Sequence, residues 1–82
     1  MSAPINTPQE IKVSTGPRGQ PAAIALNSSS KRVISIQNRW RIDDEWWREE
    51  ISRMYYEVLL SDGSLRTIFQ DLITGEWYRQ RY

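Results

Sequence analysis

The chain has 82 residues, with 11 basic and 10 acidic side chains, a formal net charge of +1, and neither cysteine nor histidine. This composition excludes a disulfide framework, a structural zinc site and nucleophilic catalysis by histidine or cysteine. A chain of this length forms at most one small domain, and its balanced charge gives no overall bias toward nucleic acid or a membrane surface.

The first segment, residues 1–9, reads MSAPINTPQ and contains two prolines among small polar residues. Such a composition predicts a disordered N-terminal tail, followed by a single small β domain over residues 10–82. The charged-then-apolar layout of an export signal is missing and no long apolar run follows. We therefore expect a cytoplasmic protein.

A β-hairpin is predicted next, with strands near residues 10–15 and 21–26. The run Gly16-Pro17-Arg18-Gly19 between them is a strong turn signal, because glycine tolerates positive φ and proline fixes its own φ. Pro21 lacks an N–H group, which places the second strand at an edge or makes Pro21 its first residue. Residues 27–30, NSSS, are expected to form a connecting loop.

Residues 31–42 show the alternation of a half-buried strand. The apolar side chains occupy even positions and are expected to point to the core: Ile34, Ile36, Trp40 and Ile42. The segment that follows, DDEWWR at residues 43–48, has no alternation. A short helical turn or loop is predicted there.

A second hairpin is centred on Asp62-Gly63, which is typical of a two-residue type I′ turn. With that loop length, Tyr56 faces Phe69 and both side chains lie on the core face. Thr74-Gly75 then predicts another tight turn, followed by a last strand through Trp77, Tyr78 and Tyr82. Together these elements predict an all-β fold, a five- to six-stranded antiparallel meander curled into a small SH3-like open barrel.

Aromatic side chains are concentrated from residue 40 onward, and they can serve either as core or as a binding surface. The alternation favours the core for Trp40, Tyr56 and Phe69. Trp46 and Trp47 are neighbours, so only one of them can readily enter the core. Exposed rings with nearby arginines are typical of interface hot spots, and they also suit base stacking. The candidate partner-binding residues are Arg41, Trp46, Trp47, Arg48, Arg53 and Tyr55.

Alternatives to a binding patch are an ion-paired solvated face for the arginines and a purely structural role for the rings. Signals for catalysis are weak, because the acidic residues at 43–45 and 49–50 have the pattern of a loop charge run and no Gly-rich phosphate loop is present. We therefore expect no enzyme activity, no catalytic residue, no cofactor and no metal.

Several short motifs occur in a fixed order through the second part of the chain. They are Arg39-Trp40, Trp46-Trp47-Arg48, Arg53 followed by Tyr55-Tyr56, Asp62-Gly63, and Asp71 followed by Thr74-Gly75 and Trp77-Tyr78. This series, over residues 31–82 with weaker similarity back to Glu10, resembles a small bacterial domain of unknown function. That domain stands alone or lies at the C-terminus of ImuB-like proteins, which are catalytically degenerate relatives of the Y-family DNA polymerases.

The resemblance implies an accessory role near translesion synthesis, without polymerase activity. The favoured hypothesis is a non-catalytic module that binds a protein partner in DNA damage tolerance or replication, such as a polymerase-like component of the mutagenesis machinery. One alternative is a single-stranded nucleic-acid-binding domain that uses the same rings and arginines. Another is a structural or homodimerisation domain without a ligand, as a monomer or weak homodimer. No membrane or small-molecule substrate is expected.

Overall fold

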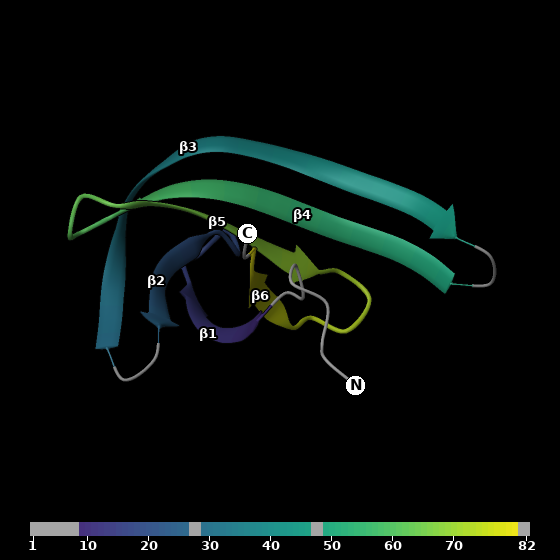
Figure 1. Ribbon diagram of the computed structural model, residues 1–82, viewed down its shortest axis with the longest axis horizontal. Coiled ribbons are helices and arrows are strands. Elements are labelled where there is room, and N and C mark those ends of the chain that lie inside the picture. The colour runs from purple at the N-terminus through teal and green to yellow at the C-terminus, as the bar shows by residue number, and fades with distance from the viewer. Residues whose placement is uncertain (1–8, 27–28, 47–48, 81–82) are drawn as a thin grey trace, which may run out of the picture.

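The computed structural model describes residues 9–26, 29–46 and 49–80, and all regular elements in these ranges are strands (Figure 1). Each strand pairs antiparallel with the next, and the last pairs with the first, so that the strands close a barrel. The prediction of an all-β antiparallel meander curled into a small barrel is confirmed, and the ring of pairings is closed rather than open. The strands are β1 (Gln9–Thr15), β2 (Pro21–Leu26), β3 (Ser29–Trp46), β4 (Glu49–Leu60), β5 (Leu65–Asp71) and β6 (Trp77–Arg79).

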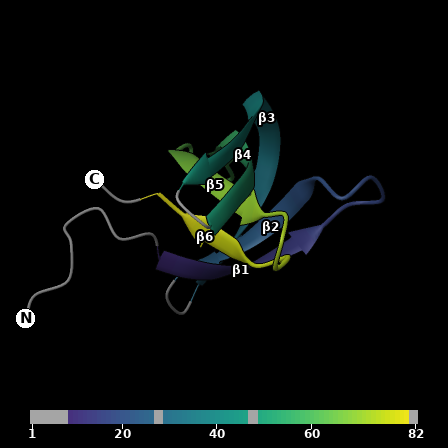
Figure 2. The same ribbon diagram turned by 90° about the vertical axis from the view of Figure 1, so that its right-hand side faces the viewer.

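The first hairpin, β1–β2, forms where the turn residues predicted it, and it extends to one side of the barrel in Figure 2. Gly19 has a φ of 80°, and Pro21 is the first residue of β2. The strand β1 begins at Gln9, one residue inside the predicted tail, because Gln9 pairs with Arg79 of β6. Residues 1–8 of that tail lie outside the described ranges.

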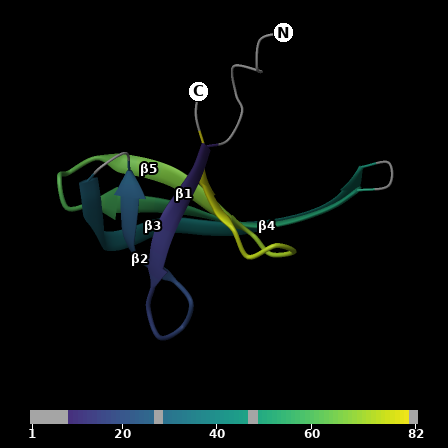
Figure 3. The same cartoon turned by 90° about the horizontal axis from the view of Figure 1, so that it is seen from below.

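The strands β3 and β4 form a long arm that extends beyond the rest of the barrel (Figure 3). The prediction of a helical turn or loop at residues 43–48 is wrong for the part that is described, since β3 continues to Trp46 and pairs with β4 from Glu49 onward. A helix of a few residues is marginal in water, whereas a continuing hairpin supplies backbone hydrogen bonds along the whole segment. The predicted loop at 27–30 is likewise shorter, because Ser29 already belongs to β3.

The hairpin β4–β5 is correctly predicted, but its register is shifted by one residue. The amide of Leu60 donates to the carbonyl of Ser64, so the loop comprises Ser61, Asp62 and Gly63, and Gly63 has a φ of 86°. This is the three-residue hairpin loop that ends in a left-handed residue, instead of the two-residue type I′ loop. As a result Phe69 pairs with Tyr55 rather than with Tyr56.

The predicted turn at Thr74-Gly75 is present between β5 and β6. The carboxylate of Asp71 accepts hydrogen bonds from the amides of Ile73 and Thr74, and Gly75 has a φ of 84°. This turn brings the short strand β6 alongside both β5 and β1. Tyr82, which was predicted to extend the last strand, lies outside the described residues.

The core fills one face of the sheet inside the barrel. Tyr56 belongs to it, as expected, and so does Trp77, with the two ring centroids 5.6 Å apart. Phe69 is buried, as expected, but it lies with Tyr55 on the other face of the sheet. Trp40 lies on that face too, and it is exposed rather than part of the core. The remaining buried members of the core cluster are Ile11, Ile24, Val58, Leu60 and Ile68.

The expected inward face of β3 is also wrong. Two register shifts interrupt its pairing with β4, one between Val33 and Ser35 and one between Ile36 and Asn38. Each bulge inserts one extra residue into β3, so the side chains after it point to the opposite face of the sheet from the one that simple alternation predicts. The second shift moves Trp40 and Ile42 to the face opposite the core, whereas Ile36 stays in register with the buried Val58. All four apolar residues that the alternation assigned to the core are exposed: Ile34, Ile36, Trp40 and Ile42.

Candidate partner-binding surface

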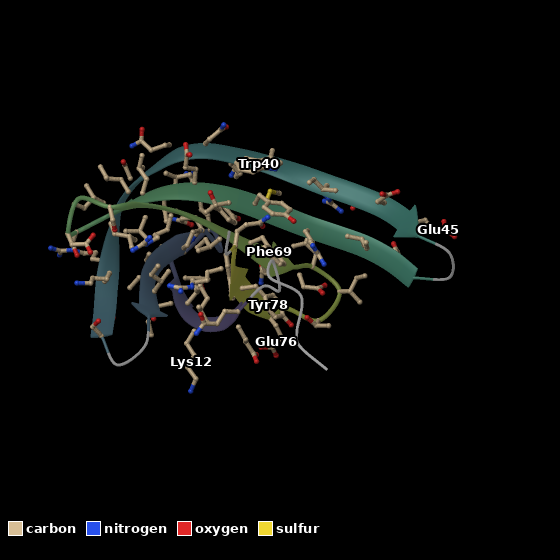
Figure 4. All side chains as sticks on the ribbon, in the orientation of Figure 1. Lys12, Trp40, Glu45, Phe69, Glu76 and Tyr78 are labelled. Atoms are coloured by element: carbon tan, nitrogen blue, oxygen red, sulfur yellow. The ribbon has the colours of Figure 1, made fainter. Side chains whose placement is uncertain are left out.

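Four rings from four strands stack in a row on the face of the sheet opposite the core, and we call them the aromatic ladder: Trp40, Tyr55, Phe69 and Tyr78. Trp40 of β3 lies 5.4 Å from Tyr55 of β4, with planes only 7° apart. Tyr55 is 4.9 Å from Phe69 of β5, which is 5.3 Å from Tyr78 of β6. Figure 4 labels Trp40 on the arm, with Phe69 and Tyr78 near each other over the barrel.

The ladder is buried in its middle and open at its ends. Phe69 is 2% exposed and Tyr55 is 9% exposed, because each is stacked on both sides. Trp40 is 38% exposed at the outer end, and Tyr78 is half-buried at the other end. Such stacked cross-strand pairs stabilise a sheet beyond the area that they bury.

Arg53 joins the ladder from the same face of β4. Its guanidinium carbon lies 4.7 Å from the centre of the Phe69 ring, a cation–π contact, and its Nη1 donates to the Tyr55 hydroxyl at 3.3 Å. Asp71 is the residue opposite Arg53 on β5. These two residues, with Phe69 and Tyr78, line a small cavity of about 250 Å³.

Arg41 lies on the opposite face of the arm from the ladder, in register with Met54. Its Nε donates to Asp43 Oδ2 at 2.7 Å and its Nη2 to Oδ1 at 3.2 Å. The buried hydroxyl of Ser52 donates to Asp43 Oδ1 at 2.7 Å. The Ser52 hydrogen bond, followed by those from Arg41, lowers the pKa of the Asp43 carboxyl below its usual value.

The candidate residues predicted from the sequence therefore separate. Arg53 and Tyr55 lie together in the ladder, whereas Arg41 does not join them. The backbone of Trp46 ends β3, but its side chain is not described, and Trp47 and Arg48 lie outside the described residues. Sequence reasoning missed the exposed Trp40 and the half-buried Tyr78 as members of the ladder, and it placed the buried Phe69 on the wrong face of the sheet. One signal was available in the sequence: if Ser61–Gly63 is read as a three-residue loop, Phe69 aligns with Tyr55 instead of with Tyr56.

Two further cavities are present in the described part of the chain. One, of about 540 Å³, lies at the arm and is lined by acidic residues and Ile51. The larger, of about 700 Å³, lies where β1 meets β6, beside Ile11, Lys12 and Trp77. Its rim carries Glu10 and Glu76, whose side chains hydrogen-bond to each other, and this contact raises the pKa of Glu76 above its usual value.

Replacing Glu10 with glutamine is expected to return the pKa of Glu76 toward the ordinary range, measured by NMR titration of the side-chain carboxyl. Because the folded-state pKa of Glu76 is raised, the native state binds more protons than the unfolded state in that interval, and stability falls as the pH rises through it. The variant should therefore gain stability at neutral pH and none well below the unfolded pKa. An unchanged Glu76 titration would show that Glu10 does not cause the shift.

No group of three or more acidic side chains that could hold a metal ion is found among the described residues. The described part also contains no helix that is long and apolar enough to cross a membrane. Comparison of the chain with models of protein families, with curated proteins and with solved structures gives no match. The function must therefore be inferred from the surface itself.

Proposed function

We propose that this protein is a non-catalytic interaction module that binds a protein partner on the aromatic ladder and the adjoining cavity at Arg53. The observation that supports this proposal is the position of the rings. A domain of this size needs large side chains in its core, yet four rings are stacked on the sheet face that points away from it. Aromatic residues and arginine are the types enriched in interface hot spots.

The exposed end of the ladder offers the apolar contact. Trp40 and Ile42 are both exposed and lie on the ladder face of β3. At the other end, the cavity beside Arg53 is smaller than a typical small-molecule pocket of about 300–1,000 Å³, so a partner's side chain suits it better than a metabolite. Arg53 and Asp71 provide a polar rim on which such a side chain can be oriented.

Charge favours a protein over a nucleic acid as the partner. The guanidinium of Arg41 is engaged by Asp43 and faces away from the ladder, so it cannot support phosphates next to the rings. The middle rings have both faces covered and are not available to bases. The acidic residues of the arm would also repel a phosphate backbone: Asp43, Asp44, Glu45 and Glu50.

The class of partner follows from the resemblance to the small domain found with ImuB-like proteins. The motifs that carry this resemblance include Trp40, Arg53 and Tyr55, which are members or neighbours of the ladder surface. We therefore propose a polymerase-like component of the cytoplasmic DNA damage tolerance machinery as the protein that docks here.

Replacing Trp40 with alanine should weaken binding to a purified ImuB-like protein by about 2 kcal/mol, roughly thirtyfold in Kd, as measured by isothermal titration calorimetry. Trp40 is suited to this test because its ring is at the open end of the ladder and contributes little to the core. Ile73→Ala, at a 57% exposed position in the β5–β6 turn, is the control and should bind as the unaltered chain does. Equal affinity of the folded Trp40 variant would overturn the proposed surface.

A fluorescence titration with a labelled single strand of DNA or RNA distinguishes protein docking from the alternative function, single-stranded nucleic-acid binding. Nucleic-acid binding would weaken as salt rises, with a log–log slope of about −0.7 for each phosphate that is neutralised. We expect no saturable binding. Saturable binding with such a slope, lost in the Trp40→Ala variant, would replace protein docking by nucleic-acid binding.

A further inference from the structure

The outer edge of β3 is unpaired along the arm. Residues 29–32 pair with β2, but from Val33 to Trp46 the described part of the chain supplies only β4 as a neighbour. One row of backbone groups along this segment therefore has no partner strand in the described chain, although the amides of Arg39 and Glu45 donate to the side-chain Oδ1 atoms of Asn38 at 2.9 Å and Asp44 at 2.8 Å. From Asn38 to Trp46 the pairing with β4 has no register shift, so the edge is a regular strand in this part.

The charges along this regular edge have an unusual order. Arg39, Arg41, Asp43 and Glu45 alternate with the residues of the ladder face, so they lie on one face of β3. Read along the strand, the charges are positive, positive, negative, negative. All four residues are exposed, and in the described chain neither Arg39 nor Glu45 has a side-chain ion pair.

This order is its own complement when the strand is reversed. An antiparallel copy of β3 that sets Ile42 opposite Ile42, with the two-fold axis midway between them, places Arg39 opposite Glu45 of the second copy, and Arg41 opposite Asp43 of the second copy. The two-fold symmetry repeats both pairs, and Ile42 meets its own equivalent on the other face. Moving the axis by one residue loses this match, because Arg41 would face Arg41 or Asp43 would face Asp43.

The backbone geometry permits the same arrangement. In an antiparallel strand, alternate residues direct their N–H and C=O groups to each side, so the open groups of the β3 edge belong to every second residue. When a residue lies directly opposite its own equivalent, the open N–H and C=O groups of one strand face the open C=O and N–H groups of the other. A free edge usually carries charges that discourage pairing, but here a second copy in this register places opposite charges face to face. Arg41 and Asp43 are already paired within one chain, so the gain falls mainly on Arg39 and Glu45.

We propose that the β3 edge is a self-association surface, and that two copies of this chain pair antiparallel through residues 39–45 around Ile42. The pairing uses the backbone edge and the Arg39–Glu45 face, and it does not depend on the proposed binding of a partner at the ladder. In the dimer, the sheets of both copies join across the two arms. The two aromatic ladders then lie on one continuous sheet face.

The test uses two charge-reversal variants of the full chain. Arg39→Glu with Arg41→Glu makes this face of the edge wholly acidic, and Asp43→Arg with Glu45→Arg makes it wholly basic. Sedimentation velocity over a concentration series should show that the unaltered chain dimerises. Each variant alone should be monomeric, or should dimerise with an affinity weakened by on the order of a hundredfold, because like charges then face each other. An equimolar mixture of the two variants should dimerise again, since acidic and basic edges are complementary.

The control reverses two exposed charges away from the edge, Arg18→Glu with Arg66→Glu, and changes the net charge by the same amount as the acidic variant. It should dimerise as the unaltered chain does. Circular dichroism of each variant checks that the strands are intact. An unaltered chain that stays monomeric at every concentration, a dimer that both variants preserve, or a mixture of folded variants that fails to associate would each overturn the proposal.

Discussion

Substitution of Phe69 by alanine is expected to lower the free energy of unfolding by about 3–5 kcal/mol. The ring is 2% exposed and is stacked between Tyr55 and Tyr78, and the Arg53 guanidinium lies against it at 4.7 Å. Alanine removes all of these contacts and leaves a partly buried arginine beside a void. For a domain whose total stability is of the order of 5–15 kcal/mol, this loss is a large fraction.

Urea denaturation followed by tryptophan fluorescence measures this effect, and a thermal scan should show a decrease in Tm of roughly 4–8 °C for each kcal/mol. Ile73→Ala is again the control, and it should change stability by no more than about 0.5 kcal/mol because its side chain is exposed. A loss below about 1 kcal/mol for the Phe69 variant would mean that the ladder is not packed as described.

Substitution of Trp77 by alanine is expected to cost a similar amount, about 3–5 kcal/mol, but for a different reason. Trp77 is 7% exposed in the core and packs against Tyr56 with the ring planes tilted by 34°, and its strand β6 is only three residues long. The strand pairs with Ile11 on one side and with Gln70 on the other, so this ring anchors the seam that closes the barrel.

Hydrogen exchange distinguishes this loss at the seam from a general loss of stability. The amides of β1 and β6 should lose more protection in the Trp77→Ala variant than those in the middle of the β4–β5 pairing. Trp77→Phe retains a ring and should lose only about 1–2 kcal/mol. Equal loss of protection throughout the chain would show that the seam is not a separate unit.

The sequence was sufficient for the three glycine turns and for most of the strand positions because their signals are local, but not for the continuation of β3 to Trp46. Alternation marked the strands, and Gly16-Pro17, Asp62-Gly63 and Thr74-Gly75 marked the turns. The register of β4 against β5 was beyond this reasoning, since Asp-Gly is compatible with a two-residue loop and also with a three-residue loop that ends in glycine. A shift of one residue moves every side chain to the other face, so the buried Phe69 packs beside Tyr55 rather than beside Tyr56.

The surface was predictable only in part for the same reason. Arg53 and Tyr55 were identified from their residue types and because they lie on the opposite face of the strand from Tyr56. Trp40 was assigned to the core because nothing in the sequence of β3 marks the register shifts before and after Ile36. Arg41 was grouped with the rings by proximity in sequence, although a strand separates odd and even positions onto two faces.

Closure of the barrel by β1 and β6 has a consequence for how the chain folds. All the other strand pairings join strands that are consecutive in the chain, whereas the pairing of β1 with β6 joins strands from opposite ends of the described sequence. The hairpins can form in microseconds from local contacts, but the closing contact requires the whole intervening chain to be ordered or its loop entropy to be lost. High contact order is thus confined to a single step, and we expect that step to limit the folding rate.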